Sequence, residues 1–151
     1  MQAKYRRLRD AAYADGQAAF PELARDPTFR DFVCLYIGEG YKRSRNEVAL
    51  CNSDPTVIRL ADRWIKRFAR NPIRYAIQYH ADQDLDELTK FWAAQVEVEP
   101  SVIRLQRKSN SNALTGRNWR SKYGVFTVSA GDTLLRAKLE AWMDSIRESW
   151  V

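Results

Sequence analysis

One glutamate, Glu39, has the type and setting of a residue that could do chemistry. It lies between Gly38 and Gly40, directly after an apolar run over residues 32–37 that predicts a helix buried in the core or in an interface. A carboxylate is unfavourable at a helix C-terminus, which already carries partial negative charge, unless a cation offsets it. Mg²⁺ would do so, because carboxylate oxygens and the Gly38 carbonyl are hard ligands suited to that ion. The alternative reading, equally open, is that the glycines end the helix and Glu39 points to water.

Other catalytic or metal-binding patterns are scarce in the sequence. The chain has one histidine, His80, and two cysteines, Cys34 and Cys51, which match neither a multi-histidine metal site, a zinc site nor a disulfide framework. We interpret His80, at the end of a predicted strand, as a structural residue. Neither a glycine-rich phosphate loop nor a nucleophile elbow occurs in the sequence, so the candidate chemistry rests on Glu39.

The distribution of charge favours a nucleic-acid partner. The 25 Lys and Arg residues and 19 Asp and Glu residues give a net charge of +6. Residues 101–125 contain six basic side chains and no acidic one, and residues 59–74 contain six against one. Such a polarised surface attracts phosphate, and the aromatic residues Trp119 and Tyr123 are interleaved with the basic ones. The alternative is a solvated helix face and a flexible loop.

The elements that must position these residues follow from local signals. At 151 residues the chain is expected to form one α+β domain, residues 26–151, preceded by a helical segment over residues 1–25. Asp26-Pro27 and Asp54-Pro55 are helix starts, with an N-cap oxygen followed by proline. The predicted helices cover residues 5–16, 28–38, 55–70 and 85–92 and the segment after Asp132, and the predicted strands cover residues 41–45, 47–51, 73–80, 102–108 and 123–129.

The segment from Phe32 to Gly40 (Phe-Val-Cys-Leu-Tyr-Ile-Gly-Glu-Gly) resembles the LAGLIDADG motif of homing endonucleases, particularly its variants that end in Gly-Glu-Gly. A hairpin, a helix start at residues 52–55, further strands and a closing helix also fit this family. The resemblance covers residues 26–146, mainly through the order of elements, and implies a mixed or antiparallel sheet that forms a saddle packed with helices. Two features depart from the pattern: the helix between His80 and Pro100 interrupts the usual αββαββα order, and Ile37 stands where the family often has an acid.

The resemblance implies a homodimeric, Mg²⁺- or Mn²⁺-dependent endonuclease that cleaves double-stranded DNA at specific sites. Glu39 would be catalytic and would bind metal with the Gly38 carbonyl, and Lys122 would assist proton transfer around the attacking water. The dimer interface would contain Phe32, Cys34, Leu35 and Gly38. The residues expected at DNA, from the resemblance or from the basic segment, are Tyr41, Arg43, Arg45, Arg104, Gln106, Lys108, Arg117 and Arg120.

Two other function classes stay open. A non-catalytic transcriptional regulator could bind specific DNA with the same saddle, and an RNA-binding or structural protein of a phage or mobile element is a weaker third reading. The sequence shows neither an apolar run long enough to span a membrane nor the apolar core of a signal peptide. We therefore expect a soluble, cytoplasmic protein without a membrane partner.

Overall fold

The computed structural model describes residues 1–108 and 121–151, which form an α+β arrangement around a four-stranded mixed sheet. This confirms the predicted fold class at that level. The helices are α1 (Gln2–Leu23), α2 (Pro27–Glu39), α3 (Pro55–Phe68), α4 (Leu85–Val96) and α5 (Thr133–Ser149), with a 3-10 turn, η1 (Pro100–Val102). The strands are β1 (Val48–Asn52), β2 (Ile73–Tyr79), β3 (Ile103–Arg107) and β4 (Val125–Ala130).

Four of the helices begin at an aspartate whose side chain caps them. The carboxylates of Asp26 and Asp54 accept the backbone N–H two residues on, at 2.9 Å in both cases. Asp84 and Asp132 accept the N–H three residues on, at 3.2 and 3.0 Å. Each bond satisfies a donor that has no partner inside its helix, so these starts are determined locally.

The sheet has the strand order β1-β4-β2-β3. Strand β4 is antiparallel to both β1 and β2, whereas β3 pairs parallel to β2, with Tyr75 opposite Ile103. A parallel neighbour requires a crossover connection, and α4 with η1 supplies it. The α4–β3 unit therefore adds a strand to the outer edge of β2 and leaves the pairing of β2 with β4 intact.

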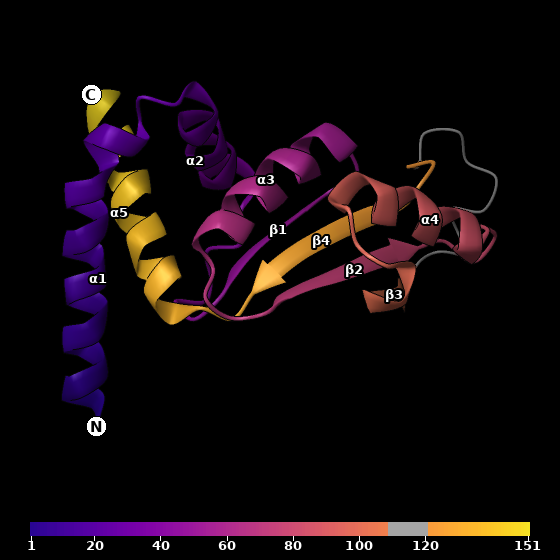
Figure 1. The fold of residues 1–151 in the computed structure, drawn as a ribbon, viewed down its shortest axis with the longest axis horizontal. Helices are drawn as coiled ribbons and strands as arrows, with labels where there is room; N and C mark the ends of the chain where they lie inside the picture. The colour runs from indigo at the N-terminus through magenta and orange to yellow at the C-terminus, as the bar shows by residue number, and fades with distance from the viewer. Residues whose placement is uncertain (109–120) are drawn as a thin grey trace.

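Helices cover one face of the sheet, and the hydrophobic core lies between them. Figure 1 shows α3 and α4 along one side of the strands, with α1 and α5 side by side at one end. The core contains Trp64, Trp92 and Trp142, each at most 1 % exposed, together with Phe126 of β4. The other sheet face has no helix packed on it among the described residues.

The first helix is longer than predicted, because its end is set by packing. It passes through Gly16, the expected terminus, and continues to Leu23 with Pro21 inside it. At Gly16 the helix lies against α5 so closely that a Cβ would be 2.9 Å from the Cα of Lys138, and the indole of Trp142 donates to the Gly16 carbonyl at 3.0 Å. Glycine serves here as a contact point between helices.

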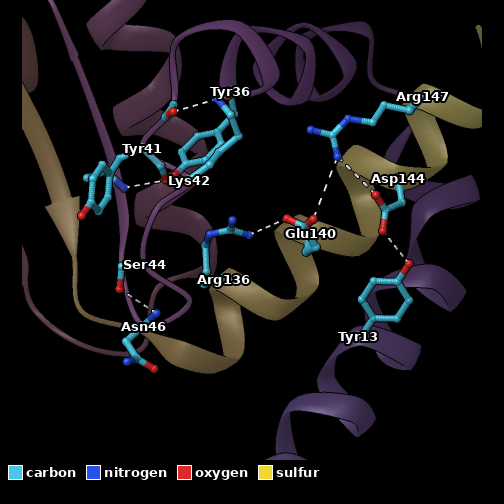
Figure 2. A network of polar contacts seen from close by, with 12 residues as sticks. Tyr13, Tyr36, Tyr41, Lys42, Ser44, Asn46, Arg136, Glu140, Asp144 and Arg147 are labelled. Atoms are coloured by element: carbon cyan, nitrogen blue, oxygen red, sulfur yellow. Dashed lines mark hydrogen bonds and ion pairs between the residues drawn. The ribbon is translucent and has the colours of Figure 1, made fainter.

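The predicted strand over residues 41–45 does not form. Only its beginning pairs with β1, through an isolated bridge between Gly40 and Leu50 and a 2.8 Å bond from the Tyr41 N–H to the Ala49 carbonyl. The Tyr41 carbonyl and the Ala49 N–H would bond each other in a continued strand pair. Instead both bond the buried Tyr36 hydroxyl, which donates to the carbonyl and accepts from the N–H. The chain then turns away towards α5 (Figure 2).

Candidate nucleic-acid interface

Glu39 is the exposed last residue of α2, and the tyrosine one turn earlier holds the backbone that follows it. The Tyr36 side chain is fully buried, and its hydroxyl lies 2.7 Å from the Tyr41 carbonyl and 3.0 Å from the Ala49 nitrogen. Burial raises the pKa of Tyr36, so its hydroxyl keeps its proton as a donor. At Gly40 a Cβ would overlap the Tyr36 ring, which explains why glycine follows Glu39.

The C-terminus of α2 is compensated by a lysine rather than left unpaired. The Lys42 ammonium donates to the Gly40 carbonyl at 2.9 Å and to the Tyr36 carbonyl at 3.3 Å (Figure 2). A cation at helix-end carbonyls offsets the partial negative charge there. The electrostatic conflict that suggested a metal ion is thus met in part by Lys42, although Glu39 itself has no ion pair among the described residues.

The uncovered sheet face is a polar surface built by strand alternation. The register aligns Ala49, Ser129 and Arg74 in one row across β1, β4 and β2. The next two rows bring further residues of all four strands to the same face: Cys51, Thr127, Ala76 and Arg104, followed by Val125, Gln78 and Gln106. We call this surface, with Tyr41 at its edge, the open face. Its middle consists of small side chains, and its long side chains are arginine and glutamine at β2 and β3.

Glu39 lies at the edge of the open face. It lines a depression of about 410 Å³ together with Tyr41, Glu47 and Thr127. Glu47 and Thr127 also line a neighbouring depression of about 200 Å³, which contains Arg74, Arg104 and Gln106. Glu47 pairs with Arg74 at 3.5 Å. The exposed carboxylate and the open face are therefore parts of one continuous surface.

The donor set for a metal ion is incomplete in a single chain. Among the described residues no three His, Cys, Asp or Glu side chains lie close enough together to hold a metal. Glu39 offers one exposed carboxylate, and divalent ions such as Mg²⁺ usually take one or two carboxylates besides water and substrate oxygens. Glu47 lines the same depression, but its carboxylate pairs with Arg74 at 3.5 Å, so a second carboxylate free of an arginine would come from a second chain.

The predicted DNA-contacting residues divide between two places. Tyr41, Arg104 and Gln106 share the open face, and Lys108 directly follows β3, where its N–H donates to the Tyr79 carbonyl at 2.9 Å. Arg43 and Arg45 do not share this surface. Since the 41–45 strand does not form, both lie in the loop that faces α1 and α5.

Of three further predicted residues, Lys122 is described, and it lies away from the Glu39 site. The Lys122 carbonyl accepts a bond from the Gln83 side chain at 2.7 Å, its ammonium lies over the Tyr123 ring, and it does not line the depression around Glu39. The proton-transfer role expected of Lys122 therefore has no support in a single chain. Arg117 and Arg120 lie outside the described residues.

The basic residues of α3 are engaged within the chain and lie on the helix-covered side of the sheet. Arg63 pairs with Asp26 at 3.8 Å, and Lys66 pairs with the buried Asp62 at 2.9 Å. Arg67 stacks over the Trp64 ring, 5.0 Å from its centroid. Of the basic group over residues 59–74, Arg74 is the member on the open face.

The outer side of α2 differs from the interface predicted for it. Phe32 is 2 % exposed and packs in the core of its own chain, so its side chain offers little surface to a second chain. Cys34 and Leu35 are half-buried, and Gly38 is exposed. Among the described residues, a Cβ added at Gly38 would meet no atom within 4 Å, so packing within this part of the chain does not explain a glycine there.

Sequence reasoning missed three residues of the site, although each carried a signal. Glu47 precedes β1 at even spacing from Ala49 and Cys51, which places it on the same face. Arg74 alternates with Ala76 and Gln78 in β2 but was grouped with the α3 cations. Lys42 follows the helix end by a spacing that allows its flexible side chain to return to the α2 carbonyls.

No protein-family model, curated protein or solved structure matches this chain. Among the described residues, no helix is both long and apolar enough to cross a membrane.

Proposed function

We propose that this protein binds double-stranded DNA through the open face of its sheet, as a homodimer. The observation that carries the proposal is the composition of that face: small side chains in the middle, with exposed Arg74, Arg104, Gln78 and Gln106 beside them. Arginine and glutamine are the side chains that form paired hydrogen bonds to guanine and adenine edges. An apolar ligand surface would not need this combination.

The size of the open face suits a DNA groove. The major groove of DNA is about 12 Å wide and admits a two-stranded β-ribbon, and the paired strands β2 and β3, about 4.8 Å apart, carry the long side chains of this face. Arg104 and Gln106 are two residues apart on β3, so their side chains project on the same side about 7 Å apart. Two neighbouring base pairs lie within reach of such a pair of side chains.

The arrangement of elements also supports a LAGLIDADG-like fold as part of the proposal. When the added α4–β3 unit is set aside, α2, the bridged segment at Gly40, β1, α3, β2, β4 and α5 follow the αββαββα order that the motif resemblance implies. The α4–β3 unit occupies an outer edge of the sheet and does not disturb this order.

Gly38 supports self-association along α2. Glycine in a helix costs about 1 kcal/mol relative to alanine, and no neighbouring atom in the described part of the chain requires a small residue at that position. Close approach of another helix backbone would require one. Two chains that packed α2 against α2 would bring both Glu39 carboxylates and both open faces to the same side of the dimer.

The DNA-binding test compares two variants that each remove two positive charges. Arg74→Ala with Arg104→Ala removes open-face cations, and Arg7→Ala with Lys90→Ala removes exposed cations that lie off this face. If each open-face arginine neutralises a phosphate, the slope of log K against log salt should fall in magnitude by about 2 in the first variant only. If one reads a guanine instead, affinity for its preferred site should fall by about 1–3 kcal/mol with a smaller change of slope. Equal behaviour of the two variants would contradict the proposal.

The position of Glu39 supports a second, catalytic function: Mg²⁺-dependent cleavage of the bound DNA. Its carboxylate is exposed beside the open face, and dimerisation along α2 would bring a second Glu39 carboxylate to it. A metal held by the two Glu39 side chains would activate water and stabilise the leaving oxygen. Glu39 would hold the ion, and Tyr36 would keep the end of α2 in place.

Cleavage and regulation are separated by one experiment on a DNA library. The wild type is incubated with the library and Mg²⁺ or Mn²⁺, and Glu39→Gln serves as a nearly isosteric control. Nicking by the wild type that is lost in Glu39→Gln supports the nuclease. Sequence-specific binding by both proteins without nicking supports a non-catalytic regulator and refutes the catalytic role of Glu39.

A further inference from the structure

A second basic surface is formed where α1 packs beside α5, at one end of the sheet (Figure 1). Two cavities of about 590 and 430 Å³ adjoin there and share Arg9, Arg45 and Asn46. We call them together the α1–α5 pocket. Its cations come from α1, from the loop before β1 and from α5, and they are Arg6, Arg9, Lys42, Arg43, Arg45 and Arg136. Two acids, Asp10 and Glu140, line it as well.

The least expected member of this group is Arg136, which is 93 % buried. Its Nη1 donates to the Glu140 carboxylate at 2.8 Å, while its Nε has no hydrogen-bond partner in the described part of the chain (Figure 2). A guanidinium carries five N–H donors, and a buried charge is costly unless it is paired and fully hydrogen-bonded. The Arg136 guanidinium is therefore paired with one carboxylate, and its buried Nε–H lacks an acceptor among the described residues.

The acidic side chains of the pocket do not fully offset the positive charge of Arg136. Glu140 is shared, because Arg147 also approaches it at 4.0 Å while bonding Asp144 at 3.2 Å. An i,i+4 ion pair explains why Arg136 faces Glu140, but it does not explain why arginines of three separate elements gather at the same cavity. Like charges repel, so this gathering favours an anionic ligand that offsets them.

We propose that the α1–α5 pocket binds a phosphate group. Arginine is suited to this because its planar fork forms two parallel charge-assisted bonds to phosphate oxygens. The phosphate is either one of a nucleic-acid backbone or that of a small phosphate ester, and both share this chemistry. The inference does not depend on DNA binding by the open face, since none of the pocket residues lies on that face. It assigns α1 a role in ligand binding.

The test uses pyrophosphate as the probe and compares two triple variants of the full chain. Arg9→Ala, Arg43→Ala and Arg45→Ala remove pocket cations; Lys4→Ala, Arg7→Ala and Lys90→Ala remove three exposed cations that line neither cavity. We expect pyrophosphate to raise the melting temperature of the wild type and the control, and its calorimetric dissociation constant to rise at least tenfold in the pocket variant. Pyrophosphate that does not bind the wild type, or binds both variants equally weakly, overturns the proposal.

Two further measurements complete the design. Arg136→Lys keeps a positive charge beside Glu140 but loses the fork, so pyrophosphate affinity should fall while circular dichroism stays that of a folded chain; unchanged affinity would refute the role of Arg136. A short DNA duplex then distinguishes the sources of phosphate. Displacement of pyrophosphate by the duplex assigns the pocket to backbone phosphate, whereas simultaneous binding of both assigns it to a small phosphate ester.

Discussion

Replacing Gly38 with alanine tests whether α2 forms the contact between two chains. The new methyl group meets no atom of residues 1–108 and 121–151 of its own chain within 4 Å, so it causes no steric strain there. Alanine is favoured over glycine in a helix interior by about 0.8–1.0 kcal/mol. Gly38 is the second-last residue of α2, where helix ends fray, so we expect a gain of about 0.5 kcal/mol in the free energy of unfolding of the monomer.

The dimer should respond in the opposite direction. A methyl group inserted between two closely packed helices costs about 1–3 kcal/mol, and each dimer contains two such positions. The dissociation constant should therefore rise at least about tenfold, since 1.4 kcal/mol corresponds to a factor of ten. Gly131→Ala is a matched control, because this exposed glycine lies outside α2 and a Cβ there makes only an ordinary 3.8 Å contact with Arg74.

Sedimentation velocity over a range of concentrations, on and off DNA, measures association, and urea unfolding at low concentration measures monomer stability. The reasoning is refuted if Gly38→Ala gains stability as expected and sediments like the wild type. It is equally refuted if the wild type stays monomeric at every concentration with and without DNA.

Three other variants test the packing that positions these surfaces. Tyr36→Phe removes two hydrogen bonds of a buried hydroxyl and should lower the free energy of urea unfolding by about 1–3 kcal/mol; a change below about 0.5 kcal/mol would contradict the positioning role. Gly16→Val should drive α1 away from Lys138, seen as faster proteolysis of the first 23 residues, and unchanged proteolysis would argue against this close contact. The hydrogen bond to Asp144 raises the pKa of Tyr13 from 10.0 to about 12, so its stabilising contribution is present below pH 10 and is lost between pH 10 and 12. Tyr13→Phe should therefore flatten the loss of stability over that interval, and an unchanged alkaline limb of the unfolding curve would count against the bond.

The sequence by itself determined the features that depend on neighbouring residues. Asp26 and Asp54 start their helices because each carboxylate bonds an N–H two residues on, and such a bond needs no tertiary partner. Strand alternation likewise placed Arg104 and Gln106 on one face, whichever strands lie beside β3. The predicted α+β class and the position of Glu39 at a helix end follow from signals of this local kind.

The tertiary structure decided what depends on residues distant in the chain. Packing against Lys138 carries α1 through Gly16, and the Tyr36 hydroxyl occupies the positions that a strand after Gly40 would have used. Arg43 consequently lies with α1 and α5 rather than on the open face. None of these outcomes could be predicted from spacing along the chain. A contact between residues distant in sequence depends on how all the apolar and polar groups pack in the folded core.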